Sequence, residues 1–113
     1  WNLEYDANDE SLHSMAEAYT RIYINTCLSN KVEVLLNIMN KGQIDGTIYH
    51  LNRSCKLMSF LNVETAEIIK GVNGKPYVSF DGDQTDPNVF SPAQYETRVQ
   101  ALVEMMEANL AAE

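Results

Sequence analysis

The fold of this chain is decided by the stretch QIDGTIYHL, residues 43–51. The stretch is rich in β-branched and aromatic residues and has no helical period, so it predicts a buried strand over residues 44–51. A second short strand is predicted for PYVSF, residues 76–80, between turn residues at 73–75 and 81–83. About 24 residues with a helical pattern separate the two strands, which is enough for a right-handed crossover and predicts parallel pairing. The core is therefore expected to be a βαβ unit.

Four segments have the apolar periodicity of amphipathic helices. The first is expected after a cap at residues 8–10, and the second begins with Asn30 as its cap and ends just before Gly42, which would adopt the left-handed conformation. The third covers residues 58–72. The fourth begins at residues 91–94, which combine a capping serine, a proline in the first turn and a glutamine three positions on. The apolar faces expected in the core are formed by Leu12, Met15, Ala16, Tyr19, Ile22 and Tyr23; by Val32, Leu35, Leu36 and Met39; by Met58, Leu61, Thr65, Ile68 and Ile69; and by Val99, Leu102, Val103, Met106 and Leu110.

These elements predict an α/β fold, a small and mostly parallel sheet flanked by helices, similar to half of a flavodoxin-like or Rossmann-like domain. With 113 residues, 45% of them hydrophobic, the chain is long enough for a core without disulfides or metals. Two strands make a thin sheet, so residues 1–5 and 21–24 are candidates for an extra strand. No repeat or linker divides the sequence, and residues 1–113 are expected to form one domain. The start has neither an initiator methionine nor a signal-peptide pattern, so we expect a piece of a longer cytoplasmic polypeptide.

The charge is acidic in total but unevenly distributed. Sixteen acids against eight bases give a net charge of −8, which argues against nucleic acid as a partner, because phosphate binding needs clustered lysine and arginine. Residues 18–80 reverse this balance, with seven bases against four acids. This locally basic region indicates either an anionic ligand or neighbour, or lysines that are simply scattered and solvated. No apolar stretch in the sequence approaches the roughly 20 residues of a membrane-spanning helix.

Two polar segments follow the two predicted strands. Ligands of open parallel sheets bind beyond the carboxyl ends of the strands, where loops and helix N-termini converge. This rule selects HLNRSCK, residues 50–56, and DGDQTDPN, residues 81–88. In the first segment Cys55 lies between Arg53 and Lys56, whose charges favour the thiolate, the form that attacks electrophiles and binds metals. The alternative is that Cys55 is a small buried hydrophobic residue.

The remaining candidate residues have weaker surroundings. Cys27 lies among small and aliphatic residues, and without a Cys-x-x-Cys motif the two cysteines cannot build a four-cysteine metal site. Asp81, Asp83 and Asp86 could bind Mg²⁺ or Ca²⁺, but they equally suit ordinary turn chemistry. His50, at the end of a strand, is either a hydrogen-bonded structural residue or a base.

Three segments carry a family resemblance: DGTIYHLNRSCK (45–56), FDGDQTDP (80–87) and FSPAQYETR (90–98). In this order they resemble the C-terminal part of a 2-hydroxyacyl-CoA dehydratase subunit, in the 2-hydroxyglutaryl-CoA dehydratase D-component family. The resemblance covers residues 8–108, and benzoyl-CoA reductase subunits are similar to the same sequence. It implies that the chain is a C-terminal fragment of a larger subunit, in an oxygen-sensitive heterodimeric enzyme of anaerobic amino-acid fermentation.

The resemblance also implies a 4Fe-4S cluster with Cys55 as one ligand, the other ligands coming from domains outside this chain. It does not indicate a catalytic residue. The two basic neighbours of Cys55 would either lower the pKa of its thiol or offset the negative charge of the cluster. The residues expected around the cluster are His50, Arg53, Lys56, Asp81 and Asp83.

The activity implied by the resemblance is the loss of water from a 2-hydroxyacyl-CoA. An ATP-hydrolysing activator iron–sulfur protein supplies one electron, the thioester is reduced to a ketyl radical, and water leaves to give a 2-enoyl-CoA. The implied partners are this activator, a second dehydratase subunit and the acyl-CoA substrate, and the isolated chain is expected to be inactive and to hold no cluster. The alternatives are a subunit of a benzoyl-CoA reductase-type enzyme, a cluster-binding accessory protein, and a cluster-free α/β interaction module.

Overall fold

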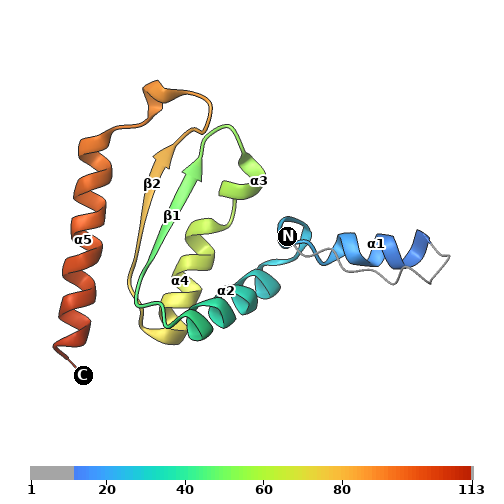
Figure 1. The fold of residues 1–113 in the computed structure, drawn as a ribbon, viewed down its shortest axis with the longest axis horizontal. Helices are drawn as coiled ribbons and strands as arrows, with labels where there is room; N and C mark the ends of the chain where they lie inside the picture. The colour runs from blue at the N-terminus through green and yellow to red at the C-terminus, as the bar shows by residue number, and fades with distance from the viewer. Residues whose placement is uncertain (1–11, 113) are drawn as a thin grey trace.

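The computed structural model describes residues 12–112, which form the predicted α/β arrangement (Figure 1). The two strands lie side by side at the centre, with α5 next to β2 and with α2, α3 and α4 on the side of β1 (Figure 1). The molecule is flat, with extents of 54 × 40 × 19 Å. In chain order the elements are α1 (Leu12–Thr20), η1 (Tyr23–Asn25), α2 (Leu28–Gly42), β1 (Thr47–Asn52), α3 (Lys56–Ser59), α4 (Asn62–Asn73), β2 (Tyr77–Gly82), η2 (Pro87–Val89) and α5 (Pro92–Leu110).

Strands β1 and β2 pair in parallel, as the length of the crossover predicts. The register joins Thr47 to Tyr77 at the start and Asn52 to Gly82 at the end. The pairing continues one residue further, because the N–H of Arg53 donates to the carbonyl of Gly82 at 3.0 Å. Both strands therefore end at one edge of the sheet, and the segments that follow them begin together.

The sheet is smaller and less buried than predicted. The first strand begins at Thr47, because the N–H of Ile44 donates to the carbonyl of Met39 and is still part of the end of α2. Ile48 of β1 is 41% exposed. The prediction of an extra strand over residues 21–24 is wrong, since a turn and the 3₁₀-helix η1 occupy this region, and residues 1–5 lie outside the described residues.

The core joins β2 to helices on either side of the sheet. Its buried apolar side chains are Met39 of α2, Ala66 and Ile69 of α4, Val78 of β2 and Leu102 of α5. Helix α5 also approaches the residue before β1: a Cβ atom at Gly46 would lie 2.8 Å from the sulfur of Met106. The absence of a side chain at Gly46 thus allows α5 to lie close to the sheet.

An aromatic stack connects β1, β2 and α5. The ring of His50 lies over that of Phe80, with centroids 5.0 Å apart and planes at 21°, and Phe80 meets Tyr95 edge to face, with centroids also 5.0 Å apart. His50 also lies against Gly82, where a Cβ atom would come within 2.6 Å of the imidazole Nε2. These contacts show that His50 packs across β2 on one face of the sheet, near the carboxyl ends of the strands.

The ends of α2 differ from the prediction. Its N-cap is Cys27 rather than Asn30, and Gly42 is the last helical residue. Gln43 adopts the left-handed conformation in place of Gly42, with φ 51°, and its N–H donates to the carbonyl of Met39. The shift by one residue arises because Met39 also accepts the N–H of the residue after Gln43, which turns the chain toward β1.

The single helix predicted over residues 58–72 is two helices. The Ser59 hydroxyl donates to the carbonyl of Asn52 at 2.7 Å, which ties the end of α3 to β1. Leu61 then adopts a left-handed conformation with φ 76° before α4 begins. The apolar period alone did not reveal this break, because it continues through the break with Met58 and Leu61 in register.

Helix α4 buries only part of its predicted apolar face. Ile69 is 2% exposed, whereas Ile68 is 39% exposed. The helix passes through Gly71 and ends at Gly74, which has φ 71° and donates its N–H to the carbonyl of Lys70.

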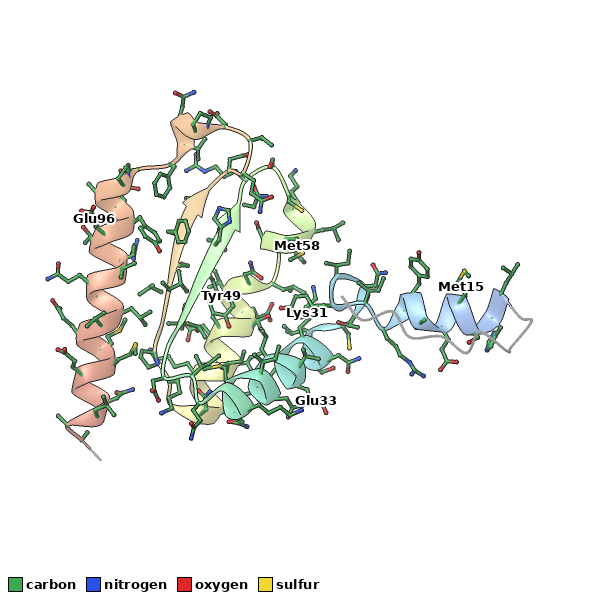
Figure 2. The ribbon with its side chains drawn as sticks, in the orientation of Figure 1. Met15, Lys31, Glu33, Tyr49, Met58 and Glu96 are labelled. Atoms are coloured by element: carbon green, nitrogen blue, oxygen red, sulfur yellow. The ribbon has the colours of Figure 1, made fainter. Side chains whose placement is uncertain are left out.

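The prediction that α1 buries an apolar face is wrong for the part of the chain that is described. Within residues 12–112 no side chain of α1 is buried, and Leu12 is 82% exposed. Met15 lies on a helix that extends away from the sheet (Figure 2). The helix ends at Thr20, so it does not continue into Tyr23 as predicted.

Helix α5 begins at Pro92 as predicted, but the Ser91 side chain forms no capping hydrogen bond. Leu102 is buried as expected, while Val103 and Leu110 are 45% and 62% exposed. The predicted stripe is therefore wider than the buried face. Across residues 12–112, no helix is both long and apolar enough to cross a bilayer.

The close fit of His50 on Gly82 gives a first prediction. Gly82→Ala should lower the free energy of unfolding by about 1–3 kcal/mol, since the new methyl group would force the imidazole off Phe80. Gly71→Ala is the matched control: no atom lies within 4 Å of a Cβ at this helical position, so the change should stabilise the protein slightly. Guanidinium unfolding measures both, and equal stabilities of the two variants would contradict the packing role of His50.

The left-handed Gln43 gives a second prediction. Gln43→Gly should raise the free energy of unfolding by about 0.5–1 kcal/mol, because glycine adopts this conformation without the steric cost of a Cβ atom. Lys41→Gly, two residues earlier and inside α2, should lower it by about 0.5–1 kcal/mol. Denaturant midpoints that move in the same direction for both variants would exclude the proposed strain.

Candidate functional site

The segments after β1 and β2 contact each other, as their position at one edge of a parallel sheet predicts. The Arg53 guanidinium forms an ion pair with Asp81, with Nη2 and Oδ2 3.2 Å apart. Both side chains are more than half exposed, at 61% and 56%, so the pair contributes at most about 1 kcal/mol to stability. Its significance is geometric, because it joins the two segments selected from the sequence.

A turn held by side chains positions Cys55. The N–H of Cys55 donates to the backbone carbonyl of Asn52 at 3.1 Å. The Ser54 hydroxyl donates to the side-chain oxygen of Asn52 at 3.0 Å. The Ser59 hydroxyl donates to the same Asn52 carbonyl. Cys55 thereby becomes the N-cap of α3, half-buried and not in a disulfide.

The acidic segment after β2 uses its carboxylates to shape itself. Asp83 accepts the backbone N–H of Thr85 at 2.9 Å and the Thr85 hydroxyl at 2.7 Å. These hydrogen bonds, with a smaller contribution from the Ser54 hydroxyl, lower the pKa of Asp83 to about 2. Asp86 likewise accepts the N–H of Asn88 at 3.0 Å. The turn interpretation of these aspartates is therefore supported.

Cys55 can supply only one ligand to a metal centre. Among residues 12–112 no three His, Cys, Asp or Glu side chains come close enough together to hold a metal ion. A half-buried thiol at the N-cap of α3 fits the position of a single ligand that is completed by groups from elsewhere.

Cys27 lies at a different place, the exposed N-cap of α2. Its sulfur is 3.1 Å from the Ser29 hydroxyl. This hydrogen bond and the N–H of Asn30 lower the pKa of the Cys27 thiol. Cys27 and Cys55 thus cap two different helices, α2 and α3.

The two basic neighbours of Cys55 point to different sites. Arg53 pairs with Asp81, whereas Lys56 lines a pocket of about 370 Å³ between η1, the start of α2 and α3. Lys31 also lines this pocket and is only 8% exposed. The other lining residues are Ile24, Thr26, Leu57, Phe60 and Leu61.

A second pocket, of about 180 Å³, lies between the carboxyl end of β2 and α5. Ser79 and Asp81 line it from β2, and Gln94 and Arg98 line it from α5. Within the described residues the Arg98 guanidinium forms no ion pair. It lines the same pocket as Asp81, the carboxylate that pairs with Arg53.

Of the residues selected from the sequence, the structure joins Arg53 and Asp81 in an ion pair. The sequence did not single out Lys31 or Arg98. Lys31 did carry a signal. It lies one helical turn before Leu35 and two before the buried Met39, on the apolar face of α2 where a lysine is unusual. The ring of His50, expected near the cluster, lies over Phe80 and Gly82 of β2.

Comparison with known proteins identifies the family of the chain. The model of the family described as 2-hydroxyglutaryl-CoA dehydratase, D-component, matches residues 1–106. Lactoyl-CoA dehydratase subunit alpha of Anaerotignum propionicum is 86% identical over 112 residues, which are 99% of this chain and 26% of that protein. The (R)-2-hydroxyisocaproyl-CoA dehydratase alpha subunit of Clostridioides difficile is 45% identical over 95% of this chain and 26% of that protein.

A more distant relative is named as a reductase. This benzoyl-CoA reductase subunit of Thauera aromatica is 30% identical over 93% of this chain and 24% of that protein. The chain spans about a quarter of the length of the curated relatives it matches. Because the family model matches nearly the whole chain, the chain belongs to the 2-hydroxyglutaryl-CoA dehydratase D-component family.

Proposed function

We propose that this chain is one domain, the C-terminal part of the alpha subunit of an iron–sulfur 2-hydroxyacyl-CoA dehydratase. The enzyme would remove water from a 2-hydroxyacyl-CoA through a ketyl radical and release a 2-enoyl-CoA. Its partners would be a second dehydratase subunit and an ATP-dependent activator protein. The observation that carries the proposal is the family membership of the chain, combined with a half-buried free cysteine at the carboxyl end of the parallel strands.

Within this enzyme we assign Cys55 as one ligand of a 4Fe-4S cluster. The Asn52 carbonyl accepts hydrogen bonds from the Cys55 N–H and from the Ser59 side-chain hydroxyl, so the turn that carries the thiol is held in place before any metal binds. When bound, the cluster would supply the low-potential electron that reduces the thioester. The remaining ligands would come from parts of the subunit outside this chain.

The neighbouring side chains would adjust the surroundings of the thiolate. The charge of Arg53 is shared with Asp81, so its influence on the sulfur is reduced by the ion pair. Lys56 has no such carboxylate partner within residues 12–112, so its charge would be available to offset the negative charge of the cluster. Asp83 is committed to Thr85 and would maintain the shape of the adjacent turn.

We infer that the substrate is lactoyl-CoA. The relative with 86% identity is named a lactoyl-CoA dehydratase, whereas the relatives named for larger acyl groups are 45% identical or less. Loss of water from the hydroxyl-bearing lactoyl group gives acryloyl-CoA, which is the product to be measured.

The cluster assignment predicts the metal content of variants. The full-length subunit, purified without oxygen, should contain iron and acid-labile sulfide, and Cys55→Ser should lose most of both, because the serine oxygen is a poor ligand for this cluster. Cys27→Ser is the matched control and should keep both, since Cys27 is the exposed cap of a different helix, α2, and is not assigned as a ligand. An unchanged iron and sulfide content in Cys55→Ser would remove the ligand assignment.

The dehydratase assignment predicts a reaction that depends on every component. Lactoyl-CoA incubated anaerobically with the full-length subunit, its partner subunit, the activator and ATP should yield acryloyl-CoA, and omission of ATP or the activator should abolish the product. Chromatography of the CoA esters measures the conversion. A protein with iron but without this activity would point to a reductase-type enzyme or an accessory protein, as the similarity to the benzoyl-CoA reductase of Thauera aromatica allows, and a protein without iron would favour an interaction module.

A further inference from the structure

Lys31 is a cation in a place where lysine is rare. The residue is 8% exposed, in the first turn of α2, and its ammonium lies 5.5 Å from the centre of the Tyr23 ring. Among the residues that the structure describes, this ammonium forms no hydrogen bond and no ion pair. Burial of a lysine without an anionic partner is costly, because a charge that leaves water needs compensation.

The ammonium of Lys31 reaches the pocket of about 370 Å³ that Lys31 and Lys56 line. In the described part of the chain, no fully buried side-chain nitrogen or oxygen lacks a hydrogen-bond partner. Because the Lys31 ammonium has no such partner, it is not fully enclosed, and the pocket is the open space that Lys31 lines. In Figure 2 Lys31 lies at the end of α2 nearest α3, the helix that supplies the other lysine.

The lining of the pocket defines the group that fits it. It includes two lysines, no Asp or Glu side chain, and the apolar side chains of Leu57 and Phe60, which are 70% and 73% exposed. A small free anion would neutralise the lysines but leave these two apolar side chains in water. A protein segment with a carboxylate and an adjacent apolar side chain would satisfy both parts of the lining.

The position of the pocket indicates where this segment comes from. In the proposed function, Cys55 is one cluster ligand and the other ligands come from parts of the same subunit outside this chain. Ligands of one cluster bind the same few iron atoms, so the segments that carry them come together at Cys55. Lys56 follows Cys55 directly, so a segment that supplies another ligand passes close to the pocket. The related alpha subunits, about four times as long as this chain, have the length to supply it.

We propose that the pocket receives an Asp or Glu side chain from a segment of the same subunit outside this chain. The carboxylate lies between Lys31 and Lys56, and an apolar neighbour in the segment covers Leu57 and Phe60. This inference rests on the proposed function, which brings other parts of the subunit to Cys55. The ion pair fixes α3, and with it the Cys55 turn, against the rest of the subunit.

The first test is zero-length cross-linking of the wild-type, full-length subunit in complex with its partner subunit. A carbodiimide joins a lysine amine to a carboxyl group only where the two are in contact. Mass spectrometry of the digested protein should find Lys31 or Lys56 joined to an Asp or Glu of the same subunit outside residues 1–113. A link from Lys31 to the second subunit, or to a carboxylate within residues 1–113, would overturn the proposal.

The second test is the thermal unfolding midpoint of the same complex. Lys31→Met should lower it by about 3 °C or more, because the carboxylate would stay buried without its partner. Lys31→Arg should keep most of the stability, and Lys41→Met, which changes an exposed lysine on the same helix, is the matched control and should leave the midpoint unchanged. Neutralising the carboxylate that the cross-link identifies should cause no further loss in the Lys31→Met background.

A Lys31→Met midpoint equal to or above that of the wild type would mean that the ammonium stays in water, and it would overturn the proposal. The cross-link on the wild type provides the test should Lys31→Met not fold. A same-subunit link in a protein without iron or dehydratase activity would uphold the pocket and reject the proposed function. An active enzyme in which Lys31 forms no such link and Lys31→Met has the wild-type midpoint would reject the pocket alone.

Discussion

The parallel pairing of β1 with β2 is the constraint on which the other features of this structure depend. It aligns Asn52 with Gly82, so the segments that follow the two strands begin at one edge. The Arg53–Asp81 ion pair is possible only in this register, and so is the stacking of His50 on Phe80. A shift of one strand by a single residue would move His50 off Gly82 and place a side chain in the space that the glycine leaves. The register therefore determines both the packing at the end of the sheet and the position of the candidate site.

The same pairing leaves much apolar surface uncovered. Parallel sheets are normally buried on both faces, yet Ile48 in the centre of β1 is 41% exposed in this chain. Ile38 of α2 and Val72 of α4 are 52% and 65% exposed. Apolar surface of this extent is typical of a surface that another part of a protein covers. This exposed apolar surface is consistent with the length of the relatives, which are about four times as long as the chain and have further sequence that could cover it.

Local patterns in the sequence predicted the elements better than their ends. The parallel crossover and the start of α5 at Pro92 follow from spacing and from a proline in the first turn, which act over a few residues. The break before α4 was missed because it depends on a hydrogen bond from Ser59 to Asn52, in a different element. The left-handed residue after α2 is Gln43 rather than Gly42 for a similar reason, since the two bonds accepted by Met39 fix the turn. In the candidate site, Arg53, Lys56 and Asp81 could be selected because they are adjacent to Cys55 in the sequence or follow from the strand register. Arg98 was missed because it lies far along the sequence, on α5, and only the packing of α5 on β2 places it beside Asp81.

Helix α3 lies next to both the Cys55 turn and the 370 Å³ pocket. Cys55 is its cap, Lys56 is its first residue, and Leu57 contributes to the wall of the pocket, so one turn of helix carries a candidate metal ligand, a cation and an apolar contact. A helix of four residues has too few internal hydrogen bonds to hold this arrangement by itself. The bond from Ser59 to the last residue of β1 supplies the missing restraint, and the left-handed Leu61 separates α3 from α4, so that α3 follows the strand rather than the longer helix. The break that the apolar pattern concealed thus leaves Cys55, Lys56 and Leu57 on a separate short helix at the end of β1.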